Sequence, residues 1–599
     1  MADGAVRRAG LARNLPRFRP GTGHFVMAAV LLLLGFYLIW PIVILLINSF
    51  NTAHDMFVDP RTWGLDHWRA AYAEPSRLLR PLRNSLLIWG LTVIISFPIG
   101  IVIAWVLART KVPFSHSLEF LFWIAYMVPG LPVTIAWMTL LDPSIGFINQ
   151  ALVKLPFIEQ GPFNIFSVAG IVWVGLMGNG IAIKVMLLTP AFRNMDAAME
   201  EAARISGANN LRTMLRVTLP LMISPITLIF ALQLLRVFQS FETEWLLGLP
   251  FGFFVYSTKI FALVSTEIPN YGEATALASL TLLIIAFIIP LQRWILQRRR
   301  YTTVTGSFRP GLIDLGPWNQ ISSVLIGTLL LLLTIMPVLV LFVAGLMNRI
   351  GYFQLGFTMD HWVLVLGDRA FLSSLRTTLL LGFMAAVGSP LLFSLLAYIL
   401  VRTRLPGRTL LDMVIWGSGA IPGILSGLGL LLVVLGTPGL TQLYGTIWIL
   451  FLVVIISGNT TGVNIMKGVF VQVGQDMEDA ARVAGAGWVR TYFRIWIPLL
   501  MPMLVLLAVM NFTAAATATS SVILLASRDT WTLSILALIQ AGQGGEGREV
   551  ASIISIFIVM ISVAGALVVR TIGLRMGLRH DIRARGAPAP AMASVGRSM

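Results

Sequence analysis

The sequence predicts an all-α polytopic membrane protein with about twelve transmembrane helices, arranged as two parallel six-helix repeats. Three observations support this fold class. The 599 residues are 57% hydrophobic and only 12% charged, with a mean hydropathy of +0.85, which is too apolar for a soluble protein. The apolar residues form runs long enough to cross a bilayer, which takes about 20 residues. One polar segment also occurs twice, with its surroundings in the same order.

Twelve apolar runs are predicted to be spanning helices. They are 25–50, 84–108, 117–141, 166–190, 219–241, 273–297, 319–347, 374–401, 411–435, 445–470, 497–521 and 549–573. The first run is too long for a signal-peptide core, so we expect a retained helix whose N-terminus is cytoplasmic. The expected domains are a basic N-terminal tail (1–24), a first repeat (25–297), a linker (298–318), a second repeat (319–573) and a basic C-terminal tail (574–599).

The net charge of +17 is explained by arginines at the predicted cytoplasmic ends of the even-numbered helices. Examples are Arg109, Arg193, Arg298, Arg402, Arg494 and Arg570. This distribution follows the positive-inside rule, so both chain ends are expected in the cytoplasm. The basic charge therefore indicates contact with membrane lipid, and nucleic acid is not expected as a partner. The chain has no cysteine, which excludes disulfides and thiolate chemistry.

The duplicated polar segment is MEEAARISG at 199–207 and MEDAARVAG at 477–485, an offset of 278 (477 minus 199). Pro129-Gly130 returns as Pro422-Gly423 at an offset of 293. The second half is thus about 15 residues shorter (293 minus 278) between its third and fourth helices, where loop 142–165 has no full counterpart. Since order and direction are kept, the halves are direct repeats related by a pseudo-two-fold axis along the membrane normal.

The first copy of the motif predicts a helix–turn–helix at the cytoplasmic surface. Met195, Ala198, Met199, Ala202 and Ile205 fall at helical spacing and form an apolar face. Gly207 is expected to end that helix in the left-handed conformation, and Asn209 or Asn210 to begin a second short helix. An ordinary interfacial helix is the alternative for one copy, but two copies at matching positions favour two docking points for a soluble partner.

The motif resembles the loop signature of bacterial binding-protein-dependent ABC importer permeases of the type I fold: Glu-Ala-Ala, three residues, Gly, nine residues, then Ile-x-Leu-Pro. The first copy departs in Val217, and the second in Asp479 and Ile497. The resemblance implies that each loop is a coupling helix bound by one copy of a cytoplasmic ABC ATPase. It also implies a periplasmic or extracytoplasmic substrate-binding protein and a bacterial inner membrane location. The coupling residues it implies are Glu200, Glu201, Ala202, Ala203, Gly207, Glu478, Asp479, Ala480, Ala481 and Gly485.

No enzymatic activity is expected of this chain. None of its five lysines follows a glycine and precedes Ser or Thr, so the phosphate-binding loop of an ATPase is missing. ATP and Mg²⁺ are therefore expected on a separate partner chain. The six histidines have no metal-ligand spacing, and no catalytic triad is apparent, so no catalytic residue, metal site or cofactor is predicted here.

Polar residues within spans mark pathways more often than lipid-facing surfaces. The candidates in the first half are Asn179 and five residues assigned to the fifth helix, Gln233, Arg236, Gln239, Glu242 and Glu244. Those in the second half are Asn459, Asn511, Thr513 and Thr517. Gln233 pairs with Asn511 at the 278 offset, and Asn179 is expected to correspond to Asn459. Hydrogen bonding between helices is the alternative role for each, and Lys184 and Lys467 are expected to snorkel to the inner interface.

The sequence therefore predicts the permease subunit of an ATP-driven importer for a small polar or charged solute. Fused double permeases of this size most resemble the iron(III) import permeases, which favours iron(III). Thiamine, polyamine, phosphonate and sugar phosphate remain open, since no residue selects among them. A secondary transporter is the main alternative from another class, but such transporters often use inverted repeats, whereas this repeat is direct. A membrane scaffold without transport activity is a third.

Overall fold

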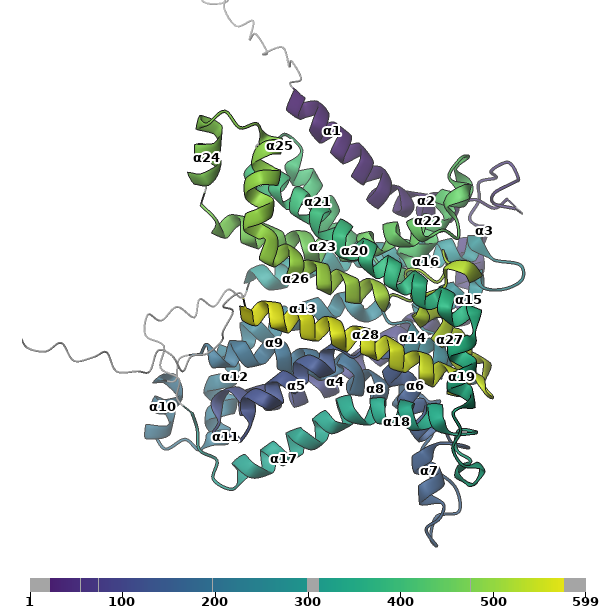
Figure 1. The fold of residues 1–599 in the computed structure, drawn as a ribbon, viewed down its shortest axis with the longest axis vertical. Coiled ribbons are helices and arrows are strands. Elements are labelled where there is room, and N and C mark those ends of the chain that lie inside the picture. The colour runs from purple at the N-terminus through teal and green to yellow at the C-terminus, as the bar shows by residue number, and fades with distance from the viewer. Residues whose placement is uncertain are drawn as a thin grey trace, which may run out of the picture.

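The computed structural model describes residues 22–575 except 54, 74, 196–197, 299–311, 404 and 475, and this part of the chain is almost entirely helical. Most of the predicted linker and nearly all of both tails lie outside the described residues. The long helices run between two ends of the molecule (Figure 1). The short helices α10 and α24 lie at one end, and α3, α7 and α19 at the other.

The first half comprises α1 to α16. Its elements are α1 (Thr22–Leu34), η1 (Gly35–Ile39), α2 (Trp40–Asn48), α3 (Asp66–Ala73), α4 (Pro75–Arg109), α5 (Ser115–Met127), α6 (Gly130–Leu141), α7 (Phe147–Leu152), α8 (Val168–Gly175), η2 (Leu176–Gly180), α9 (Ala182–Arg193), α10 (Ala198–Ile205), α11 (Asn210–Thr213), η3 (Met214–Thr218), α12 (Leu219–Leu221), α13 (Ile223–Leu234), η4 (Leu235–Phe238), α14 (Glu242–Gly248), η5 (Leu249–Phe251), α15 (Tyr256–Val264) and α16 (Tyr271–Arg298).

The second half comprises α17 to α28. Its elements are α17 (Trp318–Leu330), η6 (Leu331–Ile335), α18 (Met336–Leu346), η7 (Phe353–Leu355), α19 (Asp360–Gly367), α20 (Arg369–Arg402), α21 (Arg408–Ser418), α22 (Gly423–Gly436), η8 (Thr441–Leu443), α23 (Ile447–Gln472), α24 (Asp476–Val483), α25 (Trp488–Thr491), η9 (Tyr492–Trp496), α26 (Ile497–Ala516), η10 (Arg528–Thr530), α27 (Leu533–Gln543) and α28 (Gly547–Arg575). The order of long helices repeats that of the first half, which confirms the predicted fold class.

Four of the twelve predicted spans are bent rather than straight. Within the described residues, eight helices are apolar and long enough to cross a membrane unbroken, and five further pairs qualify only as bent pairs. The predicted spans 117–141, 166–190, 219–241 and 411–435 each fall on such a pair, with bends of 94°, 42°, 65° and 113°. The prediction of four continuous helices there was wrong, because a hydropathy window does not register a change of direction.

The two sharpest bends lie at the repeated Pro-Gly pairs. α5 ends at Met127 and α6 begins at Gly130, and the intervening Val128 and Pro129 are extended (ψ 123° and 148°). In the second half, α22 begins at Gly423 after an extended Pro422. The residue before a proline rarely adopts the helical backbone conformation, and proline itself has no N–H to continue a helix. The same sequence pair therefore breaks the third helix of each half.

Four π turns have a common cause. η1, η3, η6 and η9 each end directly before a residue that precedes a proline, as in Leu219-Pro220 after η3. Since proline lacks an N–H, the residue before it bonds one residue further back, for instance from the Leu219 N–H to the Met214 carbonyl. The fifth π turn of the described chain, η2, has no proline after it and contains Gly178, whose backbone leaves the helical region (φ −76°, ψ −111°).

A pair of short helices follows the fifth long helix of the first half and was missed by the sequence prediction. α14 and α15 bend by 76° and return before α16 begins. The second half repeats this arrangement with a connecting segment after Ala516 and the short apolar helix α27. Glu242 and Glu244 are therefore on α14 rather than on the fifth helix, and the predicted span 497–521 ends at Ala516.

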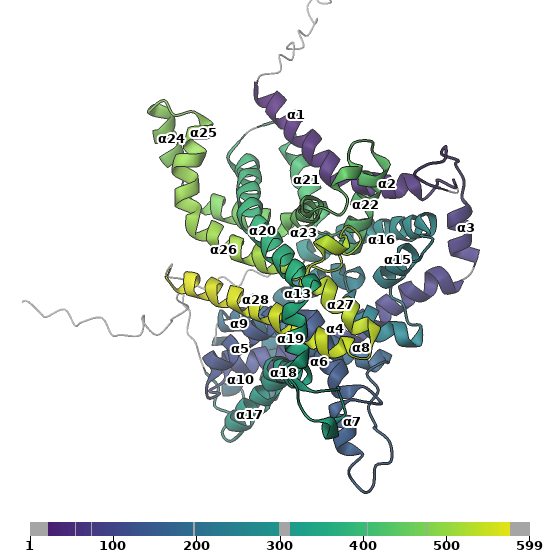
Figure 2. The ribbon, with the colours of Figure 1, turned by 45° about the vertical axis from the view of Figure 1, so that its right-hand side comes forward.

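Each half lends its first helix to the other half. α2 packs against α22 of the second half, while α18 packs against α6 of the first half. The reciprocal exchange is close, because a side chain added at Gly429 of α22 would lie 2.8 Å from the Pro41 carbonyl oxygen. Figure 2 shows α1 and α2 running along the helices of the second half. Such an exchange is what a two-fold relation between the halves requires.

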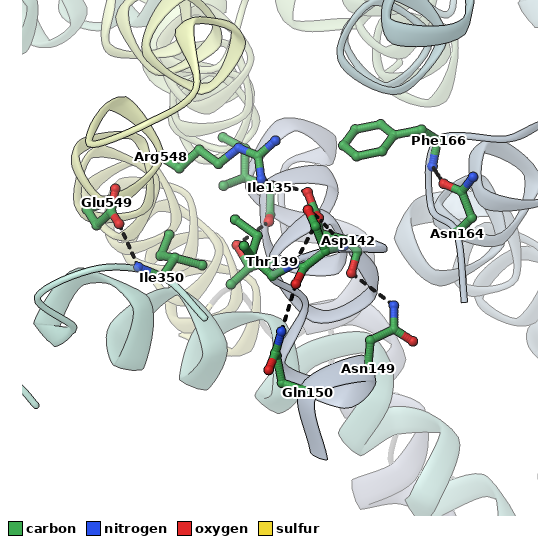
Figure 3. A network of polar contacts seen from close by, with 12 residues as sticks. Ile135, Thr139, Asp142, Asn149, Gln150, Asn164, Phe166, Ile350, Arg548 and Glu549 are labelled. Atoms are coloured by element: carbon green, nitrogen blue, oxygen red, sulfur yellow. Dashed lines mark hydrogen bonds and ion pairs between the residues drawn. The ribbon is translucent and has the colours of Figure 1, made fainter. Parts of the chain in front are cut away.

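The halves are also joined at the end that carries α7. Arg548, at the start of α28, binds the Asp142 carboxylate at 2.7 Å (Figure 3). Burial raises the pKa of Asp142, but hydrogen bonds from Arg548, Ser144 and Ile145 outweigh it and hold the pKa below its usual 3.8. The neighbouring Glu549 accepts from the Ile350 N–H at 2.7 Å. The loop 142–165, which the second half lacks, is thus anchored to that half.

Candidate functional site

The first copy of the duplicated motif forms the predicted helix–turn–helix. α10 ends at Ile205, and Gly207 adopts a left-handed φ of +84°. The Ala208 N–H reaches back to the Ala203 carbonyl at 3.0 Å, as in a glycine-terminated helix. Asn209 then caps α11, its side chain accepting from the Arg212 N–H at 2.8 Å. Gly485 repeats the left-handed turn at φ +76° after α24.

A buried ion pair anchors α10 to the end of α4. Arg109 and Glu200 are each only 1% exposed, and the Arg109 guanidinium binds the Glu200 carboxylate at 2.5 Å and 3.2 Å. A second nitrogen of Arg109 donates to the Met195 carbonyl at 3.1 Å. The Thr218 hydroxyl donates to the other Glu200 oxygen at 2.6 Å. This carboxylate therefore ties together α4, α10 and the start of the following span.

The second copy is anchored differently. Glu478, which corresponds to Glu200, is buried and accepts from the Tyr398 hydroxyl at 3.2 Å. Arg402, which corresponds to Arg109, donates to the Phe470 carbonyl at 2.5 Å and also to the Val473 carbonyl. Its guanidinium stacks 4.9 Å from the Trp496 ring. Aromatic side chains therefore contact both residues of the second anchor, whereas the first anchor is an ion pair.

The remaining motif residues lie on the surface. Glu201, Ala202, Gly207, Asp479, Ala480 and Gly485 are exposed, Ala203 is half-buried and Ala481 is buried. The predicted apolar face is not directed inward as a whole, because Met199 and Ile205 are exposed. The second copy exposes the equivalent Met477 and Val483. Exposed apolar side chains therefore recur at equivalent positions of the two helices.

Two adjoining cavities lie between the helices that are long enough to cross a membrane. The first-half cavity, of about 230 Å³, is lined by first-half residues that include Asn179, Lys184, Gln233, Arg236, Glu242 and Glu244. The central cavity, of about 350 Å³, lies between the halves and is lined by Asn179, Arg236 and Glu242 together with Thr513, Thr517 and Thr519. Seven of the ten predicted pathway residues thus line one cavity or both.

The start of α14 lies where the halves meet. Glu242 lies next to Thr519 and Ser520 of the second half. Ser520 is the repeat equivalent of Glu242 (242 plus 278), and residues that contact their own equivalents lie close to a two-fold axis. Next to it, Thr243 shares a hydrogen bond of 2.7 Å with Thr134 of α6. The short helices missed in the sequence therefore form the contact between the halves along the path.

Three predicted pathway residues do not line either cavity: Gln239, Asn459 and Asn511. Asn511 donates within its own helix to the Leu507 carbonyl at 2.8 Å. Asn459 is buried in the regular helix α23, whereas Asn179 belongs to the π turn η2. Their predicted correspondence was wrong, since an offset of 278 places Ser457 opposite Asn179.

The snorkelling predicted for Lys184 was also wrong, whereas that of Lys467 stays a prediction. Lys184 is 2% exposed and lies with its ammonium 5.3 Å from the centre of the Phe97 ring. Lys467 pairs with Asp412 at 2.5 Å. Lys184 was therefore missed as a cavity residue, because the sequence contains no sign of the helix that covers it. Among the described residues, no group of three His, Asp or Glu side chains is placed to hold a metal ion.

Comparison with known proteins places these features in one family. The family model of the binding-protein-dependent transport system inner membrane component matches residues 96–301. The ferric transport system permease protein FbpB of Actinobacillus pleuropneumoniae is 24% identical over 531 residues, covering 84% of this chain and 72% of that protein. A putative FbpB of Haemophilus influenzae is 24% identical over 527 residues, covering 84% and 79%. The maltodextrin permease MdxG of Bacillus subtilis is 30% identical over 205 residues, covering 33% and 71%.

The family match and the geometry agree. The matched region contains the first copy of the duplicated motif, and the alignments to the two ferric permeases extend over both halves. Helices α10 and α24 carry the family signature at the same end of the molecule (Figure 1). The chain belongs to the family of binding-protein-dependent transport system inner membrane components and is an ABC importer permease with two permease repeats in one chain.

Proposed function

We propose that this chain alone forms the membrane pathway of an ATP-driven importer. Repeats 25–297 and 319–573 enclose the path, and residues 1–24, 298–318 and 574–599 lie in the cytoplasm. Two copies of an ABC ATPase bind α10 and α24, and one binding protein delivers solute from the other side. The observation that carries this proposal is the pair of exposed apolar faces on two helices that are each anchored from within.

The anchors give the coupling a mechanical route. When the ATPase subunits close on ATP, they move the exposed residues Glu201, Ala202, Asp479 and Ala480. Glu200 transmits this movement to α4 through Arg109, and Glu478 transmits it to α20 through Tyr398. α4 lines the first-half cavity, so displacement of its end changes access to the pathway. Gly207 and Gly485 keep each coupling helix separate from the following span.

The proposed solute is small and polar or charged, with iron(III) favoured. Support comes from the two relatives named as ferric permeases, whose alignments cover 84% of this chain. Thiamine, polyamine, phosphonate and sugar phosphate are the alternatives. Calorimetric screening of the partner binding protein decides among them, and tight binding of one of these alternatives with no binding of iron(III) refutes iron(III).

The proposed function is tested by reconstitution in vesicles with the ATPase and the binding protein. We expect uptake of radiolabelled iron(III) only with ATP and with both partners present. Uptake driven by a proton or sodium gradient without the ATPase identifies a secondary transporter instead. Orientation is tested with single cysteines, which the cysteine-free chain permits. Cysteines at positions 12 and 590 are expected to react only from the cytoplasmic side, and a control cysteine at Lys154 only from outside.

A further inference from the structure

The first-half cavity lies beside the π turn η2. The other described π turns are each explained by a proline, but η2 is not. η2 is a kink of 42° between two helical segments, at which the Gly178 backbone leaves the helical region, and irregular backbone within a membrane helix is tolerated where it lines a cavity. Here it places Gly178 and Asn179 in the cavity wall, and Asn179 also lines the central cavity. The irregular backbone thus faces the space that a solute crosses.

Lys184, one turn beyond η2, is buried in the same wall. A side chain added at Gly100 of α4 would lie 2.5 Å from the Lys184 Cβ, so only glycine opposite it leaves room for the lysine. No carboxylate of the described chain lies within ion-pair distance of its ammonium, whose one recorded contact is the Phe97 ring. A buried ammonium without a counter-ion is unfavourable, so the site is suited to an anion.

The acidic residues of the cavity do not pair with its cations. Glu242 lies next to Thr519 and Ser520 of the second half, and Glu244 lies beside Ser240. The Arg236 side chain lines both cavities and forms no hydrogen bond or ion pair within the described residues. The side chains of Lys184 and Arg236 therefore keep their donors available to the cavity, which favours a ligand rich in acceptors.

The second half has no such site. At the 278 offset Lys184 becomes Gly462, and Arg236 becomes Ala514. The ring of Phe393, which corresponds to Gly100 at the 293 offset, packs against Gly462 and takes the place of the lysine. In the first half the glycine lies on α4 and the bulky Lys184 on α9, whereas in the second half the bulky Phe393 lies on α20 and the glycine on α23. The equivalents of Lys184 and Arg236 in the second half are therefore uncharged.

We propose that the first-half cavity binds an oxyanion, a carboxylate or a phosphate, through Lys184 and Arg236. This inference rests on the proposed import function. The anion is either a group of the transported solute or a separate anion that travels with a cation. A volume of about 230 Å³ accepts a small polyatomic anion with water, since one water needs roughly 10–15 Å³.

The test is anion binding to the full chain in lipid nanodiscs. Phosphate, citrate and the neutral control maltose are titrated, with calorimetry and intrinsic tryptophan fluorescence, to which Trp89 of the cavity wall contributes, as readouts. We expect saturable binding of phosphate or citrate and none of maltose. Arg236→Met and Lys184→Met weaken binding at least tenfold, while Arg236→Lys retains most of it. The matched control Lys467→Met, whose lysine lies outside both cavities, leaves binding unchanged.

The outcomes separate this inference from the proposed function. Equal anion affinity in wild type, Arg236→Met and Lys184→Met overturns the anion site, even where ATP-driven uptake is normal. Loss of uptake with intact anion binding supports the site and counts against the import machinery. Uptake of labelled citrate or phosphate alone identifies the anion as solute. Uptake of labelled iron(III) that requires the anion identifies it as a companion. Anion binding that is lost in Arg236→Met but kept in Arg236→Lys shows that the positive charge is required, because both variants change the shape of the side chain.

Discussion

The buried pair of Arg109 and Glu200 provides the sharpest test of how the first coupling helix is held. Arg109→Met removes the cation and leaves the Glu200 carboxylate in an environment that is 1% exposed. Removing one partner of such a pair costs about 3–5 kcal/mol. A change of 1.4 kcal/mol is a factor of ten, so the undocked population of α10 should rise by roughly two to four orders of magnitude.

The double variant Arg109→Met/Glu200→Met separates lost attraction from unpaired charge. Replacing both partners of a buried pair with apolar residues is often neutral or stabilising. We therefore expect the double variant to recover most of the loss. Lys111→Met is a matched control two residues away, because Lys111 pairs with Asp314 on the surface, where both side chains are more than half exposed. No measurable change is expected from it.

The assay uses the variant Ile205→Cys. Ile205 is 88% exposed, and the chain has no other cysteine that a label could modify. A spin label there reports the mobility of α10, and ATP hydrolysis with and without transport reports coupling. Arg109→Met should mobilise the label and allow hydrolysis without transport. A label as rigid in Arg109→Met as in wild type would refute the anchoring role. A label more mobile in the double variant than in Arg109→Met would refute it as well.

Three further predictions follow from the geometry. Gly207→Val and Gly485→Val place a β-branched residue at φ +84° and +76°, which costs about 1–2 kcal/mol, and should permit ATP hydrolysis without transport in vesicles. Because hydrogen bonds hold the pKa of Asp142 below 3.8, its pairing with Arg548 stabilises the fold above that pH and is lost as the pH falls through the lowered value. Asp142→Asn should therefore lower the unfolding temperature at pH 7 and little at pH 2. Gly462→Leu collides with a buried phenylalanine ring of α20 and should lower the yield of folded protein, whereas the exposed Gly468→Leu should not.

The elements that sequence predicted well are those with a local signature. Apolar length located the long helices, and the repeated motif located α10 and α24 with their terminal glycines. The cap of the second short helix was narrowed to Asn209 or Asn210, because a cap side chain acts on the next turn, and the structure shows that it is Asn209. The bends were missed although Pro129-Gly130 and Pro422-Gly423 were visible, because proline is tolerated in many membrane helices and does not alone announce a 94° turn.

The site residues were harder to predict, because their role depends on distant partners. Lys184 has the sequence context of a lysine at a helix end, and only Gly100, 84 residues earlier (184 minus 100), explains its burial. Glu242 and Glu244 were correctly singled out as polar residues near the path, but their helix was misassigned. Arg109 was recognised only as a cytoplasmic charge, and its partner Glu200 was identified through the resemblance.

The two halves differ inside more than they differ at the surface. Exposed Met199 and Ile205 recur as Met477 and Val483, as expected if two identical subunits bind both motifs. Behind them, a buried ion pair in one half corresponds to aromatic contacts in the other. Under the proposed function, a movement of the ATPase subunits would therefore reach the two halves through different side chains, Arg109 in the first and Tyr398 in the second. The half that contains the buried ion pair is also the half that carries the charged cavity.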